Sequence, residues 1–491
     1  MEPVNASTAS QPLSRFDAIL VSVILLSLMG VVIGIFGSDA LMGATQVAMM
    51  MIGFLAALVG LKNGLSWAQI EQSIIHSSTK IVGPILIFLS IGALIGSFML
   101  SGAVPSLLYY GLNILSPTYF YPLTCLICAL VATCIGSSWT TAATIGVALI
   151  GVSYGFNLSP EITAGAIISG AYFGDKMSPL SETTNLAPAI AGSELFEHIR
   201  HMAWVSIPSF ILAVMGFLII GLNAPISAGS QAGIVAFVQT LDQHFVISPI
   251  NLIPMALLLW LALKRVPAFV AIMGVSLLAC VFSLIFQYDA LLTFAGDSKV
   301  SHVIKAFWLV LFDGFNISTQ NADVDLLLSR GGMASMVSMV WLVIASMMMT
   351  GVLEKIGYIA VLMRLMLKAV HSTGSLIAST MATCLGVNIV TGDQYMSLVL
   401  PGHMWKSEYN KRQLANVNLS RTLEDAGTLS SPLIPWNACG VYMAGTLAVT
   451  TVAYLPYCFF NLMNPLIALI FAFLNIKIIQ LNAVNSSLPE T

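Results

Sequence analysis

The sequence predicts an all-α polytopic membrane protein of about ten transmembrane helices plus two re-entrant hairpins, in a 5+5 inverted repeat with two discontinuous helices. Three observations lead to this fold class. The 491 residues are 58% hydrophobic and only 8% charged, with a mean hydropathy of +0.92, so the chain must use lipid as its solvent. Its apolar segments have the length of membrane spans, and a short motif recurs in the second half of the chain.

Ten segments are long and apolar enough to cross a hydrocarbon core of about 30 Å. They lie at about 16–36, 41–61, 81–100, 160–191, 203–222, 249–263, 267–286, 333–353, 414–450 and 455–474. Two further stretches, 119–155 and 376–401, are split by Gly and polar residues into arms of about 10 to 15 residues. Because arms of that length do not span, each stretch is predicted to be a re-entrant hairpin that enters and leaves on one side.

The positive charges test this count, because cytoplasmic loops are enriched in Lys and Arg. With the N-terminus inside, the cytoplasmic side receives Arg15, Lys62, Lys80, Arg200, Lys264, Arg265, Lys355, Arg364, Lys368, Lys406, Lys411, Arg412 and Lys477. Only Lys299, Lys305 and Arg330 fall outside, in the external segment 287–332. The sequence therefore predicts a cytoplasmic leader (1–15), a first repeat (16–224), an external linker (225–248), a second repeat (249–474) and a cytoplasmic tail (475–491).

An internal repeat supports the same plan. The run Ala132–Gly136, ATCIG, recurs as Ala382–Gly386, ATCLG, and Asp175 recurs as Asp425, both at an offset of 250 residues. Five crossings and one hairpin per half place the second half in the membrane with the opposite orientation. Many secondary transporters are built in this way, with their binding site where the two repeats meet.

The segment 170–192 carries Asp175, Lys176 and Glu182 within apolar surroundings. An ionisable side chain near the bilayer centre costs about 2.5 to 3.5 kcal/mol on insertion scales, so such residues usually serve a function. The helix through this segment is interrupted by Gly174, Pro179 and Pro188. An interrupted helix exposes backbone oxygens at membrane depth, which is typical of an ion or substrate site.

The segment 414–450 is the second broken helix, with Arg421, Glu424 and Asp425. Arg421 and Asp425 are four residues apart, so on a helix they would face one another as an ion pair that holds the fold and binds no cargo. The alternative is that Asp425 binds an ion. Both alternatives stay open at the level of the sequence.

The hairpin tips, 136–141 and 386–393, are polar and should meet the two broken helices at one central site. A carboxylate removed from water takes up a proton more readily, so a proton and a cation compete for it. The predicted carboxylates, which would hold a transported Na⁺ transiently, are Asp175, Asp393 and Asp425. Supporting oxygens are expected from Ser137, Ser138, Thr140, Thr141, Ser178, Thr183, Thr184, Asn185, Asn388, Thr391 and Asn437, and supporting charge from Lys176, Glu182, Arg421 and Glu424.

The motifs GAYFGDKMSPLSETTNLAP, TGDQYMSLVLPG and NLSRTLEDAGTLSSPLIPWN resemble the NhaC family of Na⁺/H⁺ antiporters. The resemblance covers most of the chain. It implies a multi-pass transporter of the bacterial inner membrane that exchanges Na⁺ or Li⁺ for H⁺ by alternating access and contributes to pH homeostasis. It also implies inverted repeats with paired hairpins, often as homodimers, and no cofactor.

An exchanger of malate and lactate coupled to Na⁺ and H⁺ is the alternative, because relatives within the family are similar to such proteins. Lys176 and Arg421 would suit an organic carboxylate, but both have acidic neighbours that would absorb their charge. The cation exchanger is therefore the preferred interpretation.

Other classes of protein fit less well. Gly151–Gly155 matches the G-x-S-x-G pattern of serine hydrolases, but it ends a hairpin arm rather than forming a strand-to-helix turn, so an enzyme is not predicted. No phosphate-binding loop for ATP occurs, and the few charges form no basic patch for nucleic acid. His198 and His201 lie in 194–201, predicted as a short interfacial helix with a solvated polar face; a pH sensor is the alternative there.

Overall fold

The computed structural model describes residues 13–79, 81–223, 230–319, 324–325, 328–361 and 370–481. Within these ranges the regular structure is helical, apart from one isolated bridge between Leu414 and Gln480. In the part of the chain that the structure describes, eight helices are long and apolar enough to cross a membrane, or up to ten if each of two bent helix pairs counts as one span. The prediction of an all-α polytopic membrane protein is confirmed, while the inverted repeat stays a prediction.

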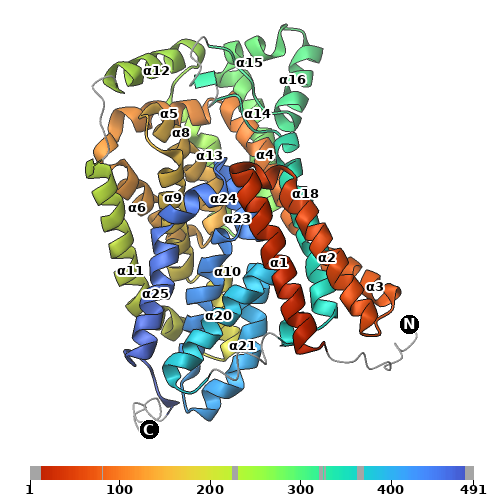
Figure 1. Ribbon diagram of the computed structural model, residues 1–491. Coiled ribbons are helices and arrows are strands. Elements are labelled where there is room, and N and C mark those ends of the chain that lie inside the picture. The colour runs from red at the N-terminus through yellow and green to blue at the C-terminus, as the bar shows by residue number, and fades with distance from the viewer. Residues whose placement is uncertain are drawn as a thin grey trace.

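The first part of the described chain forms five α-helices. They are α1 (Arg15–Phe36), α2 (Ala44–Lys62), α3 (Trp67–Thr79), α4 (Val82–Leu100) and α5 (Ala103–Ile114). Ser14 caps α1 by accepting a hydrogen bond from the Asp17 amide, and Asp17 in turn pairs with Lys62 at the end of α2, 2.8 Å between Oδ1 and Nζ. This pair closes the α1–α2 hairpin at the end of the molecule where α1 begins (Figure 1).

The stretch 119–155 forms a hairpin. It contains η2 (Pro117–Tyr119), α6 (Phe120–Ile135), α7 (Ser138–Thr141), the π-helical turn η3 (Ala142–Gly146) and α8 (Val147–Gly155). Its two ends lie together, because the rings of Phe120 and Phe156 are 5.6 Å apart and the Tyr121 hydroxyl accepts a hydrogen bond from the Ser159 amide. The chain thus turns at Gly136, in the left-handed conformation with φ 76°, and returns.

The second hairpin consists of α20 (Thr373–Thr391) and α21 (Gln394–Lys411). Its ends also meet, since Arg412 donates to the Val370 carbonyl at 3.2 Å. The predicted short arms are wrong in both hairpins, because 117–135 and α20 are each 19 residues long and pass as candidate spans. In α20 a capping box at Ser372 starts the helix early, and the helix continues through Asn388 to a left-handed Gly392.

Both predicted broken helices are interrupted. The first consists of α9 (Pro160–Met177) and α10 (Glu182–Ala191); the second consists of α22 (Asn416–Leu423), the π-helical turn η6 (Glu424–Thr428), η7 (Ser431–Leu433) and α23 (Ala438–Leu447). Pro179 lies in the gap after α9, and Ser181 caps α10 by accepting from the Thr184 amide. The predicted interruptions at Gly174 and Pro188 are wrong, because Gly174 lies inside α9 and Pro188 inside α10. The chain ends in α24 (Thr451–Tyr454), η8 (Leu455–Tyr457) and α25 (Phe459–Phe473), with a bend of 90° between α23 and 451–457.

The remaining helices of the described chain complete the bundle. They are α11 (Leu195–Asn223), α12 (Ser230–His244), η4 (Pro249–Leu252), α13 (Ile253–Leu263), α14 (Ala268–Phe286), α15 (Tyr288–Ala295), α16 (Val300–Phe312), η5 (Met333–Met336) and α18 (Val337–Lys355). The predicted separate interfacial helix at 194–201 is wrong, because these residues form the first turns of the 29-residue α11. Figure 1 shows α12, α15 and α16 at the end of the molecule opposite to the start of α1.

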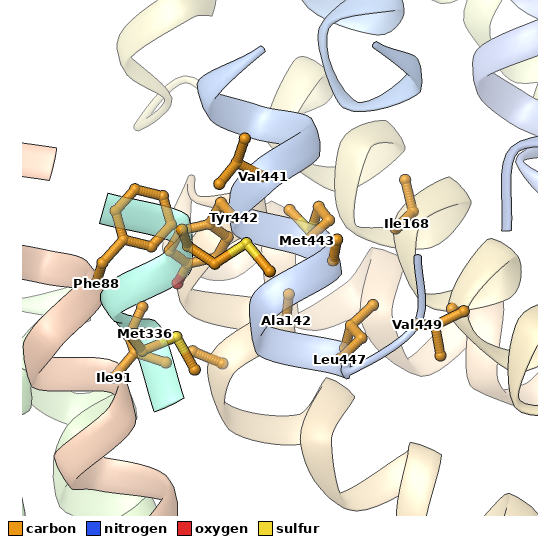
Figure 2. Close-up of a cluster of buried hydrophobic side chains, with 14 of the residues drawn as sticks. Phe88, Ile91, Ala142, Ile168, Met336, Val441, Tyr442, Met443, Leu447 and Val449 are labelled. Carbon is orange, nitrogen blue, oxygen red and sulfur yellow. The ribbon is translucent and has the colours of Figure 1, made fainter. Parts of the chain in front are cut away.

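The core joins the two halves around α23. Figure 2 shows side chains of α23 between Phe88 and Ile91 of α4 on one side and Ile168 of α9 on the other. Tyr442 of α23 stacks on Trp139 at the first hairpin tip, with ring centroids 4.0 Å apart, and its hydroxyl donates to the Trp139 carbonyl at 2.9 Å. This contact anchors the tip of the first hairpin to the second half of the chain.

α6 and α9 pack at backbone distance through two glycines of α9. A Cβ atom at Gly170 would lie 2.1 Å from the Cys125 carbonyl oxygen, and one at Gly174 would lie 2.3 Å from that of Ala129. We therefore expect Gly170→Ala to lower the free energy of unfolding by about 1 to 3 kcal/mol, the usual cost of overpacking. Thermal unfolding of the purified protein measures the change, with Gly274→Ala as the control because that site is open; equal losses in both variants would contradict the packing argument.

Candidate functional site

Asp175 lies in the last turn of α9 and faces the first hairpin tip. Its Oδ2 accepts hydrogen bonds from the Ser138 amide at 3.1 Å and the Ser138 hydroxyl at 2.7 Å, and both residues are buried. A carboxylate is unfavourable at the C-terminal end of its own helix, but here it meets the N-terminal end of α7, where free amides favour negative charge. The hairpin tip thus stabilises the Asp175 carboxylate.

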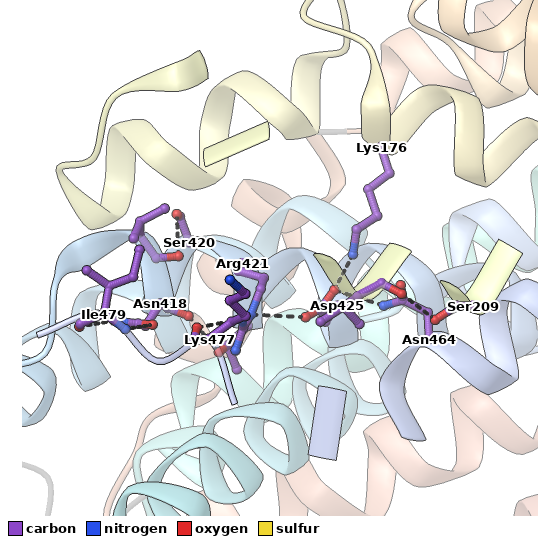
Figure 3. Close-up of polar contacts among 12 residues, drawn as sticks. Lys176, Ser209, Asn418, Ser420, Arg421, Asp425, Asn464, Lys477 and Ile479 are labelled. Atoms are coloured by element: carbon purple, nitrogen blue, oxygen red, sulfur yellow. Dashed lines mark hydrogen bonds and ion pairs between the residues drawn. The ribbon is translucent and has the colours of Figure 1, made fainter. Parts of the chain in front are cut away.

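Lys176 points in another direction, because consecutive helical residues are rotated by about 100°. Its ammonium group makes an ion pair with Asp425 Oδ1, and both side chains are buried. Figure 3 shows Lys176 reaching to Asp425 from a different element. This contact spans 249 residues of sequence and joins the two broken helices.

Asp425 has two further partners. The Arg421 guanidinium lies 3.7 Å from Oδ2, measured from Nε, and Asn464 donates to Oδ1 at 2.8 Å (Figure 3). Arg421 also donates from Nη1 to the Lys477 carbonyl at 3.3 Å. The predicted pair of Arg421 and Asp425 is present, and Lys176 pairs with Asp425 rather than with its sequence neighbour Asp175.

The first turn of α10, next to the gap after α9, carries the predicted oxygen ligands Thr184 and Asn185. The Thr184 hydroxyl is within hydrogen-bond distance of the carbonyls of Asp175, 3.2 Å, and Lys176, 3.1 Å, at the end of α9. Asn185 donates to the carbonyls of Pro179 and Ser181 at 2.8 and 2.6 Å. These side chains hold the interrupted backbone in place.

The other residues of this region have local partners. Ser178 accepts from the Leu180 amide at 3.2 Å, and the hydroxyls of Thr183 and Ser181 are 3.2 Å apart. The exposed carboxylate of Glu182 accepts a hydrogen bond from the Tyr395 hydroxyl of the second hairpin. Glu182 therefore links the first break to the second hairpin.

At the first tip, the predicted hydroxyls cap the helix that starts there. Ser137 accepts from the Thr140 amide at 3.2 Å and from the Thr140 hydroxyl at 3.1 Å, while Thr141 donates to the Ser137 carbonyl at 2.9 Å. Ser138 is the predicted ligand of this tip that contacts the Asp175 carboxylate directly.

At the second tip, a buried amide network joins the hairpin to the second broken helix. Asn388 donates to the Gly427 carbonyl at 2.6 Å and to Ser430 at 2.9 Å, and Asn437 donates to Asn388 Oδ1 at 3.0 Å. The Thr391 hydroxyl bonds back to the Val387 carbonyl at 2.8 Å.

Asp393, the third predicted carboxylate, is half-buried and serves as the N-cap of α21, where its Oδ1 accepts from the Met396 amide at 3.1 Å. Lys176, Arg421 and Asp425 thus form a buried charged cluster, to which Asn464 adds a neutral hydrogen-bond donor. Asp393 acts as a helix cap. Asn464 was missed by the sequence analysis. The sequence feature that could have revealed Asn464 is a polar amide side chain inside the apolar segment 455–474.

His198 and His201 are buried, so the prediction of a solvated polar face is wrong. Both rings interact electrostatically with the charged cluster, His198 with Lys176 and His201 with Arg421. A proton on either ring would add positive charge beside a buried cation. We therefore expect the double variant His198→Gln, His201→Gln to keep the pH profile of transport; a profile moved by a full pH unit in proteoliposomes would support the pH sensor instead.

Comparisons with known proteins agree with the motifs. A model of the Na⁺/H⁺ antiporter family matches residues 170–476. The chain is 40% identical over 424 residues to the Na⁺/H⁺ antiporter NhaC of Alkalihalophilus pseudofirmus, which covers 86% of this chain and 89% of that protein. It is 37% identical over 411 residues to NhaC of Bacillus subtilis, covering 84% and 88%.

A further relative is named for a different activity. The malate-2H⁺/Na⁺-lactate antiporter of Bacillus subtilis is 32% identical over 431 residues, covering 87% of this chain and 89% of that protein. All three relatives are named as antiporters, which are transporters rather than enzymes. With a family model over more than half of its length and relatives of this similarity, the chain belongs to the Na⁺/H⁺ antiporter family.

Proposed function

We propose that this protein exchanges Na⁺, or Li⁺, for H⁺ across the bacterial inner membrane by alternating access. The observation that carries the proposal is the charge of the buried cluster. Lys176 and Arg421 are its cations, and Asp175, Glu424 and Asp425 are its carboxylates, all five buried. With all five groups ionised, one negative charge is left over, and one monovalent cation, Na⁺ or H⁺, restores neutrality.

An uncompensated charge in the membrane interior is unfavourable in free energy, so the site without a bound ion is less stable than the site with one. A proton or a Na⁺ removes the same charge, and the two therefore compete for one position. If the site can change the side to which it opens only when an ion occupies it, the protein exchanges one ion for the other. This is the requirement for antiport driven by an ion gradient, and it needs no cofactor.

The same charge argues against an organic anion. Both cations of the cluster are already engaged by Asp425, at Lys176 Nζ and Arg421 Nε. A malate or lactate carboxylate would add negative charge to a cluster that already carries an excess. The exchange of organic acids, as in the malate/lactate relative, is accordingly the second candidate.

The site lies where the two halves of the chain meet, through the Lys176–Asp425 pair and the Trp139–Tyr442 stack. In the proposed cycle the halves move relative to each other around this point, so that the site faces one side and then the other. Cytoplasmic termini and a homodimeric assembly belong to the same proposal.

The test uses the purified full-length protein in proteoliposomes that contain a pH-sensitive dye. Gradients of Na⁺, Li⁺ or K⁺ are applied with and without malate or lactate. We expect proton movement with Na⁺ alone and none with K⁺. Proton movement that requires an organic acid would overturn the cation exchanger and favour the second candidate.

A further inference from the structure

Glu424 differs from the other carboxylates of the cluster. It lies in η6 and is fully buried, and neither of its carboxylate oxygens has a hydrogen-bond partner among the residues that the structure describes. Asp425, the next residue, has Lys176, Arg421 and Asn464, and Asp175 has both donors of Ser138. The leftover negative charge is therefore least stabilised at Glu424.

The surroundings of Glu424 come from both halves of the chain. The hydroxyls of Thr183, on α10, and Thr428, in η6, lie beside its carboxyl group without the geometry of a hydrogen bond, and Thr428 Oγ1 has no partner elsewhere in the described chain. Glu424 also interacts electrostatically with Lys176 and Asp175. Two carboxylates and two hydroxyls thus converge where the first break meets the second broken helix.

Glu424 and Asp425 are consecutive residues of the π-helical turn η6, and they have different surroundings. A π turn inserts one extra residue per turn and is frequent at functional sites. Neighbouring side chains on it point in different directions, so Asp425 reaches the cations while Glu424 faces the hydroxyls. Oxygen atoms of this kind, from carboxylates and hydroxyls, are the ligands that hard cations prefer.

We infer that Glu424 is an ion-binding carboxylate of this protein and holds the transported cation together with the hydroxyls of Thr183 and Thr428. Asp425 then serves to position Lys176 and Arg421 and binds no ion. This inference rests on the proposed exchange of Na⁺ for H⁺. When Na⁺ enters, the proton leaves the carboxyl group, and the charge of the cluster stays the same.

The first experiment measures Na⁺-driven proton flux and equilibrium binding of radioactive Na⁺ for Glu424→Gln. We expect about 10- to 100-fold weaker Na⁺ binding, the effect of losing an interaction with a charged group, and a matching loss of flux at low Na⁺. Because the amide removes an uncompensated charge, the thermal unfolding temperature should stay at or above that of the wild type. Unchanged Na⁺ binding in a folded Glu424→Gln protein would overturn the inference.

A second pair of variants tests the hydroxyl. Thr428→Val should weaken Na⁺ binding about tenfold or less, as expected for one neutral ligand, while Thr428→Ser should restore it. Thr124→Val is the matched control, because Thr124 is equally buried and its hydroxyl also lacks a partner in the described chain, but it lies on α6 away from Glu424. Equal effects of Thr428→Val and Thr124→Val would count against a ligand role, even if Glu424→Gln failed to fold.

The wild-type protein separates this inference from the function on which it rests. If wild-type proteoliposomes move protons with Na⁺ alone and Glu424→Gln does the same with unchanged Na⁺ affinity, the antiport stands and the role of Glu424 fails. If the wild type shows no proton movement with Na⁺ alone, the proposed function itself fails.

Discussion

Asp175→Asn is expected to reduce Na⁺-driven proton flux at least about 100-fold, equivalent to about 2.7 kcal/mol. The amide cannot exchange a proton for a cation because it carries no charge in either state. The fold should persist, because the amide oxygen of the variant can still accept from the Ser138 amide and hydroxyl. In the wild-type protein these donors lie 3.1 and 2.7 Å from Asp175 Oδ2. Flux of the reconstituted variant under a Na⁺ gradient measures the effect.

Asp297→Asn is the matched control for this change. Asp297 lies between α15 and α16 and pairs only with the exposed Lys299, at 3.1 Å among the described contacts. Its loss should leave the flux unchanged. Full flux in Asp175→Asn would show that Asp175 is not an exchanging group and would leave Glu424 as the candidate carboxylate.

Asp425→Asn is expected to destabilise the protein by about 3 to 5 kcal/mol, because it leaves Lys176 and Arg421 buried with their main counter-ion removed. Both cations are fully buried, so solvent cannot compensate for the lost charge. Chemical unfolding in detergent measures the loss of free energy. If Asp425 instead bound only the transported ion, the variant would lose transport and keep its stability.

The Asp17–Lys62 pair provides the comparison for stability. The Lys62 side chain is 65% exposed, so removing this ion pair by Asp17→Asn should cost about 1 kcal/mol or less. A similar loss in both variants would contradict the argument that burial makes the Lys176–Asp425 pair decisive. The contrast between the variants therefore tests burial rather than the presence of charge.

The sequence alone was sufficient for the elements that depend on local chemistry. Apolar length determined the membrane class and most spans, and Pro179 marked the break between α9 and α10, whereas Gly174 and Pro188 lie inside these helices. Spacing by four residues predicted the contact between Arg421 and Asp425, because one turn of a helix brings such residues together. The motifs led to the family, which the comparisons confirm.

Tertiary structure decided which of the polar residues meet. Lys176 pairs with Asp425 across 249 residues, a contact that no local pattern encodes. Packing also buried His198 and His201 and extended α20 beyond its apolar run. It left the Glu424 carboxylate without a hydrogen bond from any residue that the structure describes, while its neighbour Asp425 has three partners. Helical periodicity is a property of adjacent residues, whereas the partner of a buried charge depends on how distant helices pack, so the first could be predicted from the sequence and the second could not.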